Sequence, residues 1–249
     1  YYDYSAGADA YRPPDPDLPD PGRGSGVVVI AGSSTLAEEL RDAATHAGWD
    51  AAMPEGAADG EPPSLILDLS DGEEPDVPLQ GGPQAILCGS GSLAALDPAG
   101  SAIGFYALPP FADTRLVELT RGPDTAPSAG HAAEHFFATL GKHAVWVGDA
   151  PGLVLGRIVC QVINEAAFAL GEGVGSAEDI DAGFLHGLNY PRGVLSWADH
   201  IGLDQVLGVL DGLYAELHDD RYRAAPALRK LVWSGRLGHQ TGEGFFAYA

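Results

Sequence analysis

The apolar positions of the chain follow two patterns, and the change between them falls near residue 150. Before it, short apolar runs are bounded by glycine, proline and acidic residues, which is typical of buried strands. These runs predict strands at residues 26–30, 64–69, 85–88, 102–106, 116–120 and 144–147. Two longer stretches predict helices at residues 36–47 and 128–140. This mixture of strands and helices indicates an α/β domain.

After residue 150 the apolar spacing becomes helical. The helix predicted at residues 153–170 is apolar on nearly every face, which is typical of a helix that is buried all round or spans a membrane. Four polar residues interrupt it: Arg157, Gln161, Asn164 and Glu165. No uninterrupted apolar run therefore reaches the ~18 residues that a membrane span needs, and we expect a helix buried in a core.

Further short amphipathic helices follow in the C-terminal part. They are predicted at residues 180–188, 194–201, 203–217 and 227–234. Ser176 opens a capping-box-like sequence before the first of them, and Pro226 stands at the first-turn position of the last. Because no strand pattern occurs among them, residues 149–249 are predicted to form a helical bundle domain.

Composition and charge limit the partners of the chain. Its 249 residues are 45% hydrophobic and 19% charged, which is typical of a globular protein. The net charge of -22 argues against binding to nucleic acid or to an anionic membrane surface. The same negative charge disfavours the binding of polyanionic coenzyme A, unless basic residues cluster at the binding site. Cys88 and Cys160 lie in apolar segments and are interpreted as buried free thiols in a reducing compartment, with a disulfide as the alternative.

The turn after the first predicted strand stands where a dinucleotide-binding fold places its glycine-rich sequence. Gly32 matches the first glycine, but Ser34 and Ala37 replace the second and third. A Cβ atom at the second position crowds the approach of a pyrophosphate. Glu55 falls near the place of the acidic residue that holds the ribose hydroxyls. We therefore expect a Rossmann-like domain that is degenerate, with a strand, turn and helix kept for packing.

Dispersed motifs of the C-terminal part carry a family resemblance. They are residues 149–152 (DAPG), 164–166 (NEA), 173–181 (GVGSAEDID), 190–193 (YPRG), 201–204 (IGLD), 221–223 (RYR), 235–238 (GRLG) and 241–246 (TGEGFF). In this order and spacing they resemble the C-terminal helical domain of the 3-hydroxyacyl-CoA dehydrogenases. The LNYP sequence at residues 188–191 is most similar to the second helical copy of phenylacetate-pathway 3-hydroxyadipyl-CoA dehydrogenases.

The resemblance implies a set of catalytic positions. Members of the family transfer a hydride to NAD from C3 of an acyl-CoA alcohol, using a histidine base, a glutamate that orients it, a serine and an asparagine. In this chain Tyr106 stands at the histidine, Gly91 at the serine and Gly156 at the asparagine, while Glu118 keeps the glutamate. A tyrosine, with a pKa of ~10, is a poor base at neutral pH.

Glu118 is the one catalytic residue of the family that this chain keeps, and the sequence allows two roles for it. Without a histidine it has nothing to orient. The alternative is a solvated carboxylate, or one paired with Arg115 or Arg121, near the end of a strand.

Two histidine features lie outside these catalytic positions. His131, Glu134 and His135 have the spacing H-x-x-E-H of a zinc-protease motif. A third ligand is missing, so we interpret the histidines as a surface pair and expect no metal. His239 lies in a glycine-rich loop and is expected to be exposed.

The two ends of the chain carry a similar pattern. Residues 1–4 (YYDY) and 245–248 (FFAY) both read aromatic, aromatic, any residue, tyrosine, and in the resembled family this pattern ends a helical domain. No signal peptide is recognised, and the first residue is not methionine. We expect residues 1–22 to be the end of an upstream module followed by a proline-stiffened linker.

The sequence therefore predicts a degenerate Rossmann-like domain at residues 23–148 and a helical domain at residues 149–249. By resemblance the parent is a cytoplasmic NAD-dependent 3-hydroxyacyl-CoA dehydrogenase that acts on acyl-CoA, and this chain is its C-terminal half. We expect the half to act as a structural and pairing module that docks on another helical domain of the same family, with no NAD bound. The alternative is an active dehydrogenase with altered catalytic residues.

Overall fold

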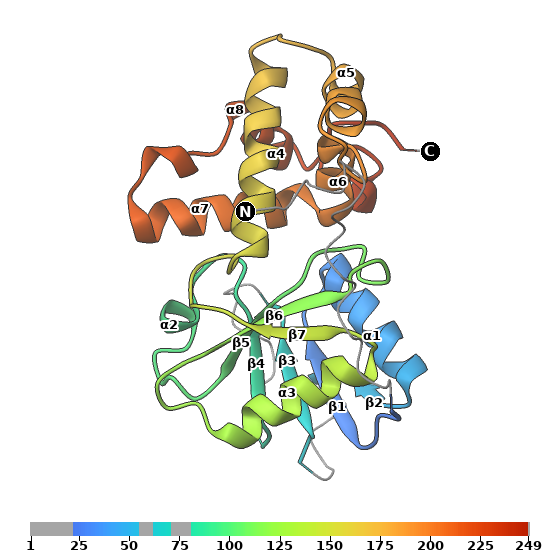
Figure 1. Ribbon diagram of the computed structural model, residues 1–249, viewed down its shortest axis with the longest axis vertical. Coiled ribbons are helices and arrows are strands. Elements are labelled where there is room, and N and C mark those ends of the chain that lie inside the picture. Colours follow the sequence, from blue (N-terminus) through green and yellow to red (C-terminus); the bar gives the residue numbers. More distant parts are fainter. Residues whose placement is uncertain (1–21, 55–61, 71–80, 249) are drawn as a thin grey trace, which may run out of the picture.

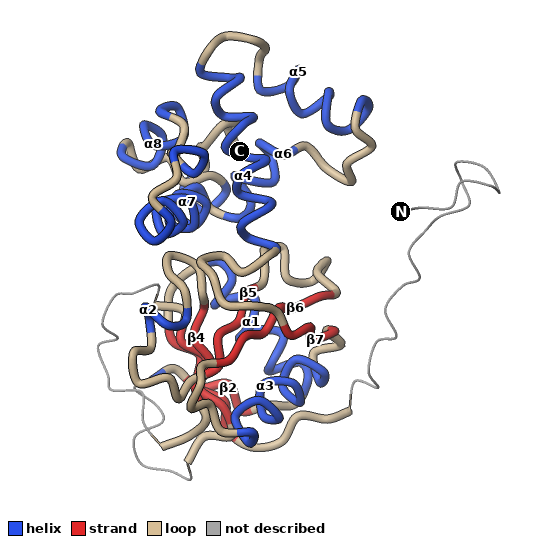
Figure 2. The backbone as a smooth tube through the Cα atoms, turned by 60° about the vertical axis from the view of Figure 1, so that its left-hand side comes forward, coloured by secondary structure: helices blue, strands red, loops and turns tan. Residues whose placement is uncertain are grey.

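The computed structural model describes residues 22–54, 62–70 and 81–248. An α/β domain carries a helical domain above the carboxyl edge of its parallel strands (Figure 1). The tube view shows the same two layers from the side, with α4 leading from one domain into the other (Figure 2). The predicted fold class is confirmed. The expectations for residues 1–21 and for Glu55 fall outside the described residues.

One sheet of seven strands forms the centre of the α/β domain, within the described residues. Its strands are β1 Val27–Ala31, β2 Asp50–Ala52, β3 Leu65–Asp68, β4 Gln84–Leu87, β5 Ile103–Tyr106, β6 Leu116–Arg121 and β7 His143–Trp146. Their order is β2-β1-β3-β4-β5-β6-β7, and all neighbours are parallel except β5 and β6. Every predicted strand is present.

The edge strand β2 is the one that the apolar pattern missed. It has three residues and pairs in parallel with β1, Asp50 lying opposite Val27. Its sequence has no β-branched or apolar run, so no local preference marks it. The adjacent Trp49 fixes this segment, because its ring packs on Phe136 and its Nε1 donates to Thr139 Oγ1 at 2.8 Å.

In the described part of the α/β domain there are three helices: α1 Thr35–Ala47, α2 Leu93–Leu96 and α3 Pro127–Thr139. The predicted helices at residues 36–47 and 128–140 are confirmed by α1 and α3. The short α2 was not predicted, because four residues are too few to show a helical period.

The helical domain contains α4 Leu155–Gly171, α5 Ala177–Ala182, α6 Val194–Ile201, α7 Leu203–Leu217 and α8 Pro226–Trp233. Ser176 and Asp179 form the predicted capping box of α5, and Pro226 is the first-turn proline of α8. The helix predicted at residues 180–188 begins earlier, at Ala177, and from Gly183 to Gly187 it is a π-helical turn.

The environment of α4 also differs from the expectation. Cys160 and Ile163 are fully buried, but Val154 and Ile158 are 45% and 57% exposed on the opposite face. The prediction of a helix buried on every side is therefore wrong within this chain. Both cysteines are buried and free, as expected. In the described part of the chain, no helix has the length and apolarity that a membrane crossing requires.

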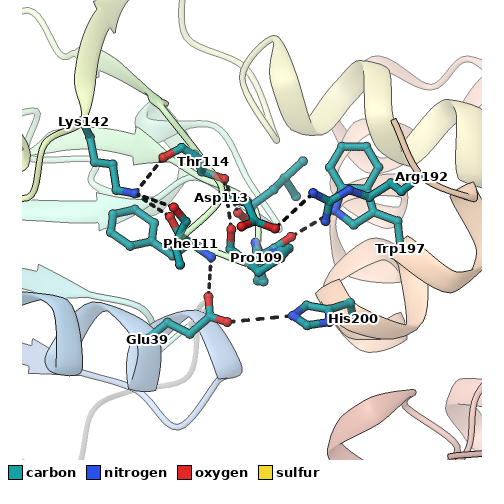
Figure 3. Close-up of polar contacts among 12 residues, drawn as sticks. Glu39, Pro109, Phe111, Asp113, Thr114, Lys142, Arg192, Trp197 and His200 are labelled. Atoms are coloured by element: carbon teal, nitrogen blue, oxygen red, sulfur yellow. Dashed lines mark hydrogen bonds and ion pairs between the residues drawn. The ribbon is translucent and has the colours of Figure 1, made fainter. Parts of the chain in front are cut away.

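A loop at residues 107–114 joins the two domains (Figure 3). Trp197 Nε1 of α6 donates to Pro109 O at 3.0 Å, and Arg192 forms an ion pair with Asp113 at 3.2 Å. On the side of the α/β domain, Lys142 is buried and its Nζ donates to Phe111 O and Thr114 O at 2.6 and 2.7 Å. The loop is therefore held by the Lys142 ammonium group on the side of the α/β domain and by Trp197 and Arg192 on the side of the helical domain.

Candidate functional site

The family positions lie where the carboxyl edge of the parallel strands meets the helical domain. Tyr106 ends β5, and its direct cross-strand partner in the antiparallel β6 is Glu118. Both side chains are buried, with 4% and 5% exposure. The structure thus brings the histidine and glutamate positions of the family side by side.

Gly156 of α4 completes this group. A Cβ atom at Gly156 would lie 2.5 Å from Tyr106 Cζ and 2.8 Å from its hydroxyl oxygen, closer than any side chain can approach. Cys160 follows one helical turn later. Burial raises the pKa of the Cys160 thiol to about 12, and a hydrogen bond with Tyr106 acts in the opposite direction. Tyr106, at the histidine position of the family, therefore fills the space that a side chain at position 156 would need. The glycine at the asparagine position makes this packing possible.

Glu118 has a role that the sequence did not indicate. Its Oε2 accepts hydrogen bonds from the backbone amides of Val154 and Leu155 at 3.0 and 2.8 Å. These amides belong to the first turn of α4, which has no capping side chain of its own. A carboxylate at this place satisfies free amides and complements the helix dipole. The expectation of a solvated carboxylate is therefore wrong.

The charge state of Glu118 reflects two opposing effects. Burial raises the pKa of its carboxyl group, and the hydrogen bonds from Leu155 and Val154 lower it, with the effect of burial being larger. The absence of Ser, Thr, Asp or Asn just before α4 was the sequence signal that could have revealed an external cap.

Gly91 lies apart from this group, in the loop after β4. Helix α7 packs directly on the loop, since a Cβ atom at Gly212 would lie only 2.1 Å from Ser90 O. Glu216 Oε1 of α7 accepts from the Ser92 amide at 2.7 Å. The loop that carries the serine position is thus covered by α7 and closed by an acidic side chain. Neither Gly212 nor Glu216 was singled out from the sequence.

A second carboxylate stabilises the same loop. Asp149 accepts hydrogen bonds from the amides of Leu93 and Ala94, at 2.7 and 3.0 Å, at the start of α2. Asp149 belongs to the first matching motif, but its capping role could not be read from spacing alone.

The turn after β1 is fixed by contacts of its own residues. Gly32 has φ +112° and faces β3, where an added Cβ would lie 2.7 Å from Leu69 O. The Ser34 hydroxyl accepts from the Ala37 amide at 3.3 Å, so it caps α1 at the place where a pyrophosphate would need the helix amides. Arg41 Nη2 donates to Gly32 O at 2.6 Å and further fixes the turn.

The space above this turn is filled. Ser34, Tyr106 and, from the helical domain, Ile201 and Gln205 line a pocket of about 10 Å³. A single water needs roughly 10–15 Å³. The pocket beside Ser34 therefore has room for about one water molecule.

The histidine features lie away from this group. Glu134 Oε1 accepts from Trp146 Nε1 at 2.6 Å, and His135 packs edge-on against Trp49. Among the described residues, no group of three His, Cys, Asp or Glu side chains could hold a metal ion. His239 is exposed, as expected, and stacks on Tyr248 with ring centroids 3.8 Å apart.

The helical domain matches a known family. Residues 152–248 match the family described as 3-hydroxyacyl-CoA dehydrogenase, C-terminal domain.

Curated relatives extend the match toward the sheet. A 3-hydroxybutyryl-CoA dehydrogenase of Bradyrhizobium diazoefficiens is 41% identical over 155 residues, which cover 62% of this chain and 53% of the relative. A probable 3-hydroxybutyryl-CoA dehydrogenase of Deinococcus radiodurans is 40% identical over 146 residues, 59% of this chain and 52% of the relative. The chain spans about half the length of the curated relatives that it matches.

A solved structure covers both domains. The (S)-3-hydroxybutyryl-CoA dehydrogenase from Ralstonia eutropha is 28% identical, has a TM-score of 0.67, and covers 91% of this chain and 100% of its own. The likeness therefore includes the sheet as well as the helical bundle.

The cap provided by Glu118 leads to a first prediction. Glu118→Ala removes the charged acceptor of the Val154 and Leu155 amides, and we expect a loss of about 1–3 kcal/mol of unfolding free energy. Glu118→Gln keeps one acceptor oxygen and should lose less. Urea unfolding at neutral pH measures both, and equal losses in the two variants would contradict the capping role.

The same group predicts a pH dependence with a defined sign. Because burial raises the pKa of Glu118 in the folded state, the folded protein binds this proton more readily than the unfolded chain does. The contribution of Glu118 to stability should increase as pH falls through the folded pKa toward the ordinary value of a glutamic acid. The difference between wild type and Glu118→Gln should change in this direction across a pH series.

The contact between Tyr106 and Gly156 predicts coupled substitutions. Gly156→Ala should destabilise the wild type by about 1–3 kcal/mol through overpacking. In a Tyr106→His background the smaller ring makes room, and the cost should fall by at least about 1 kcal/mol.

The matched control is Gly183→Ala, since this helical glycine has nothing within 4 Å of an added Cβ. It should be neutral or slightly stabilising. A double-mutant cycle measured by urea unfolding gives the coupling energy, and strict additivity would show that the two positions do not share this space.

Proposed function

We propose that this chain, whose residues 152–248 match the 3-hydroxyacyl-CoA dehydrogenase C-terminal domain, is a member of that family and a catalytically silent C-terminal half of such an enzyme. In the proposal, the parent oxidises a 3-hydroxyacyl-CoA to a 3-oxoacyl-CoA with NAD as hydride acceptor, in cytoplasmic acyl-CoA or phenylacetate breakdown. The half described by the structure acts as a structural and pairing module. Its domains are residues 23–148 and residues 149–249.

The contact between Tyr106 and Gly156 carries this proposal. A general base must reach the substrate hydroxyl directly or through one water. The buried Tyr106 ring lies against α4 in the place of the base and leaves no open space beside it. Glu118, the one family residue that is kept, has its Oε2 engaged by two backbone amides.

Two further contacts support a closed cleft. Helix α7 rests on Ser90 through Gly212, in the loop that carries the serine position. On the other side, Ile201 and Gln205 reach the turn after β1. Substrate and cofactor would both have to enter between these surfaces, so binding would require the two domains to separate.

Pairing through the helical domain is supported by its exposed apolar side chains. Val154 and Ile158 lie one turn apart on α4, and Val174, Leu188 and Trp233 are 75%, 62% and 78% exposed. Exposed apolar patches of this kind mark interaction surfaces. A second copy, or a similar helical domain of the parent, would cover α4.

Catalytic silence is the first expected outcome. The chain should not reduce NAD with 3-hydroxybutyryl-CoA or 3-hydroxyadipyl-CoA, and titration calorimetry should detect neither NAD nor acyl-CoA binding. The reason is the closed space around Tyr106 and Ser34. A full-length 3-hydroxybutyryl-CoA dehydrogenase serves as the positive control in both assays. Turnover that is lost in Glu118→Gln, with the fold retained, would instead support an active enzyme with altered residues.

Self-association is the second expected outcome. Burial of apolar surface contributes roughly 25 cal/mol per Å², while repulsion from the net charge of -22 is screened beyond ~8 Å at physiological salt. We expect a two-fold dimer through α4, and light scattering over a dilution series measures it. Ile158→Lys should shift the protein to monomer.

The matched control for association is Met53→Lys. Met53 is a large apolar residue of the α/β domain that is 45% exposed, and its substitution changes the charge equally. It should leave the dimer intact. A strict monomer at high concentration, or equal effects of the two substitutions, would contradict pairing through the helical domain.

A further inference from the structure

A pocket of about 480 Å³ lies in the helical domain, away from the cleft between the domains. It is lined by residues of the C-terminal end of α4, of α8 and of the C-terminal segment. Its apolar floor consists of Leu170, Ala227, Leu231 and Phe245, which are all half-buried. The volume lies within the ~300–1,000 Å³ of pockets that hold small molecules.

The charged residues at the rim of this pocket are both cations, Lys230 and Arg236. This is unusual in a chain that has 13 Lys and Arg against 35 Asp and Glu. Arg236 forms an ion pair with Glu243 at 3.1 Å, but both side chains are about half exposed, so the pair is weak and exchangeable. No carboxylate lines the pocket itself.

The two lysines of the chain differ sharply in their surroundings. Lys142 is buried and donates to backbone carbonyls of the loop between the domains. Lys230 is exposed on α8 and makes no ion pair with the residues that the structure describes. It lies on the face of α8 that carries Ala227 and Leu231, one turn or less away. Its ammonium group is therefore available at the edge of an apolar floor.

We propose that this pocket binds an amphipathic anion, namely a carboxylate with an unbranched aliphatic chain. The chain covers the floor at Leu170, Leu231 and Phe245, and the carboxylate meets Lys230, with Arg236 able to turn from Glu243 to the ligand. Long apolar chains gain affinity from the area that they bury, and the ammonium group selects the charged head. This inference does not depend on the proposed function, because the pocket shares no residue with the cleft.

Decanoate is the probe, used with the full chain and below its micelle concentration. Calorimetry should show saturable binding of one decanoate per chain, and amide shifts in NMR spectra should be confined to α8, the end of α4 and the C-terminal segment. Decan-1-ol, which has the same chain without the charge, should bind at least about five-fold more weakly, as expected for loss of one exposed ionic contact.

Substitutions then assign the site. Lys230→Gln should weaken decanoate about five-fold and leave decan-1-ol unchanged, whereas Lys230→Arg should stay within about two-fold. Arg223→Gln, an equal charge change on the surface of the same domain, is the matched control and should have no effect. Ala227→Leu fills the floor and should weaken both ligands, with the fold checked by circular dichroism.

Three results would overturn the proposal. One is the absence of saturable binding, and another is a decanoate affinity that is the same in Lys230→Gln and Ala227→Leu as in wild type. The third is dimer dissociation by decanoate together with loss of the dimer in Ala227→Leu, which would assign the pocket to a contact between copies of the chain.

Discussion

Buried or partly buried carboxylates accept hydrogen bonds from the first amides of helices that are distant from them in the chain, and these bonds fix the tertiary structure. Helix α4 begins without a capping side chain, and its first amides are satisfied by Glu118 from the sheet. Asp149 does the same for the start of α2, and Asp181 accepts from Leu195 and Ser196 at the start of α6. Each of these bonds joins segments distant in the chain, so it fixes tertiary placement as well as helix ends.

Asp199 extends this arrangement to the C-terminal segment. Its buried carboxylate accepts from the amides of Phe245 and Phe246 at 2.8 Å and from the Tyr248 hydroxyl at 2.9 Å. Burial raises the pKa of Asp199, while these three hydrogen bonds lower it. Part of the large acidic excess is thus used inside the protein to satisfy backbone donors, where basic partners are not required.

The sequence predicted most elements and few of these contacts, for a physical reason. Local apolar spacing predicts strands such as β3 and helices such as α7. The capping box at Ser176 is also a local sequence signal. Edge strand β2 has no such spacing and depends on its pairing with β1. The roles of Glu118 and Glu216 depend on contacts 37 and 124 residues away along the chain, which no window of sequence contains.

The candidate site was also predicted only in part from the sequence. The family resemblance assigned Tyr106 and Glu118 to the histidine and glutamate positions, and the structure pairs these two residues across β5 and β6. The closeness of Gly156 to the Tyr106 ring could not be inferred, since it depends on how α4 docks.

The docking of α4 also explains why a glutamate can persist where its catalytic partners are replaced. A histidine or a serine that acts only on a substrate can be exchanged without cost to folding. Glu118 cannot, because its loss leaves the first amides of α4 without their side-chain acceptor. Once α4 is held there, Tyr106 fills the space beside Gly156 and stabilises the closed arrangement by burial. A glutamate that caps a helix is therefore required for folding alone, and the presence of Glu118 is by itself no evidence of catalysis.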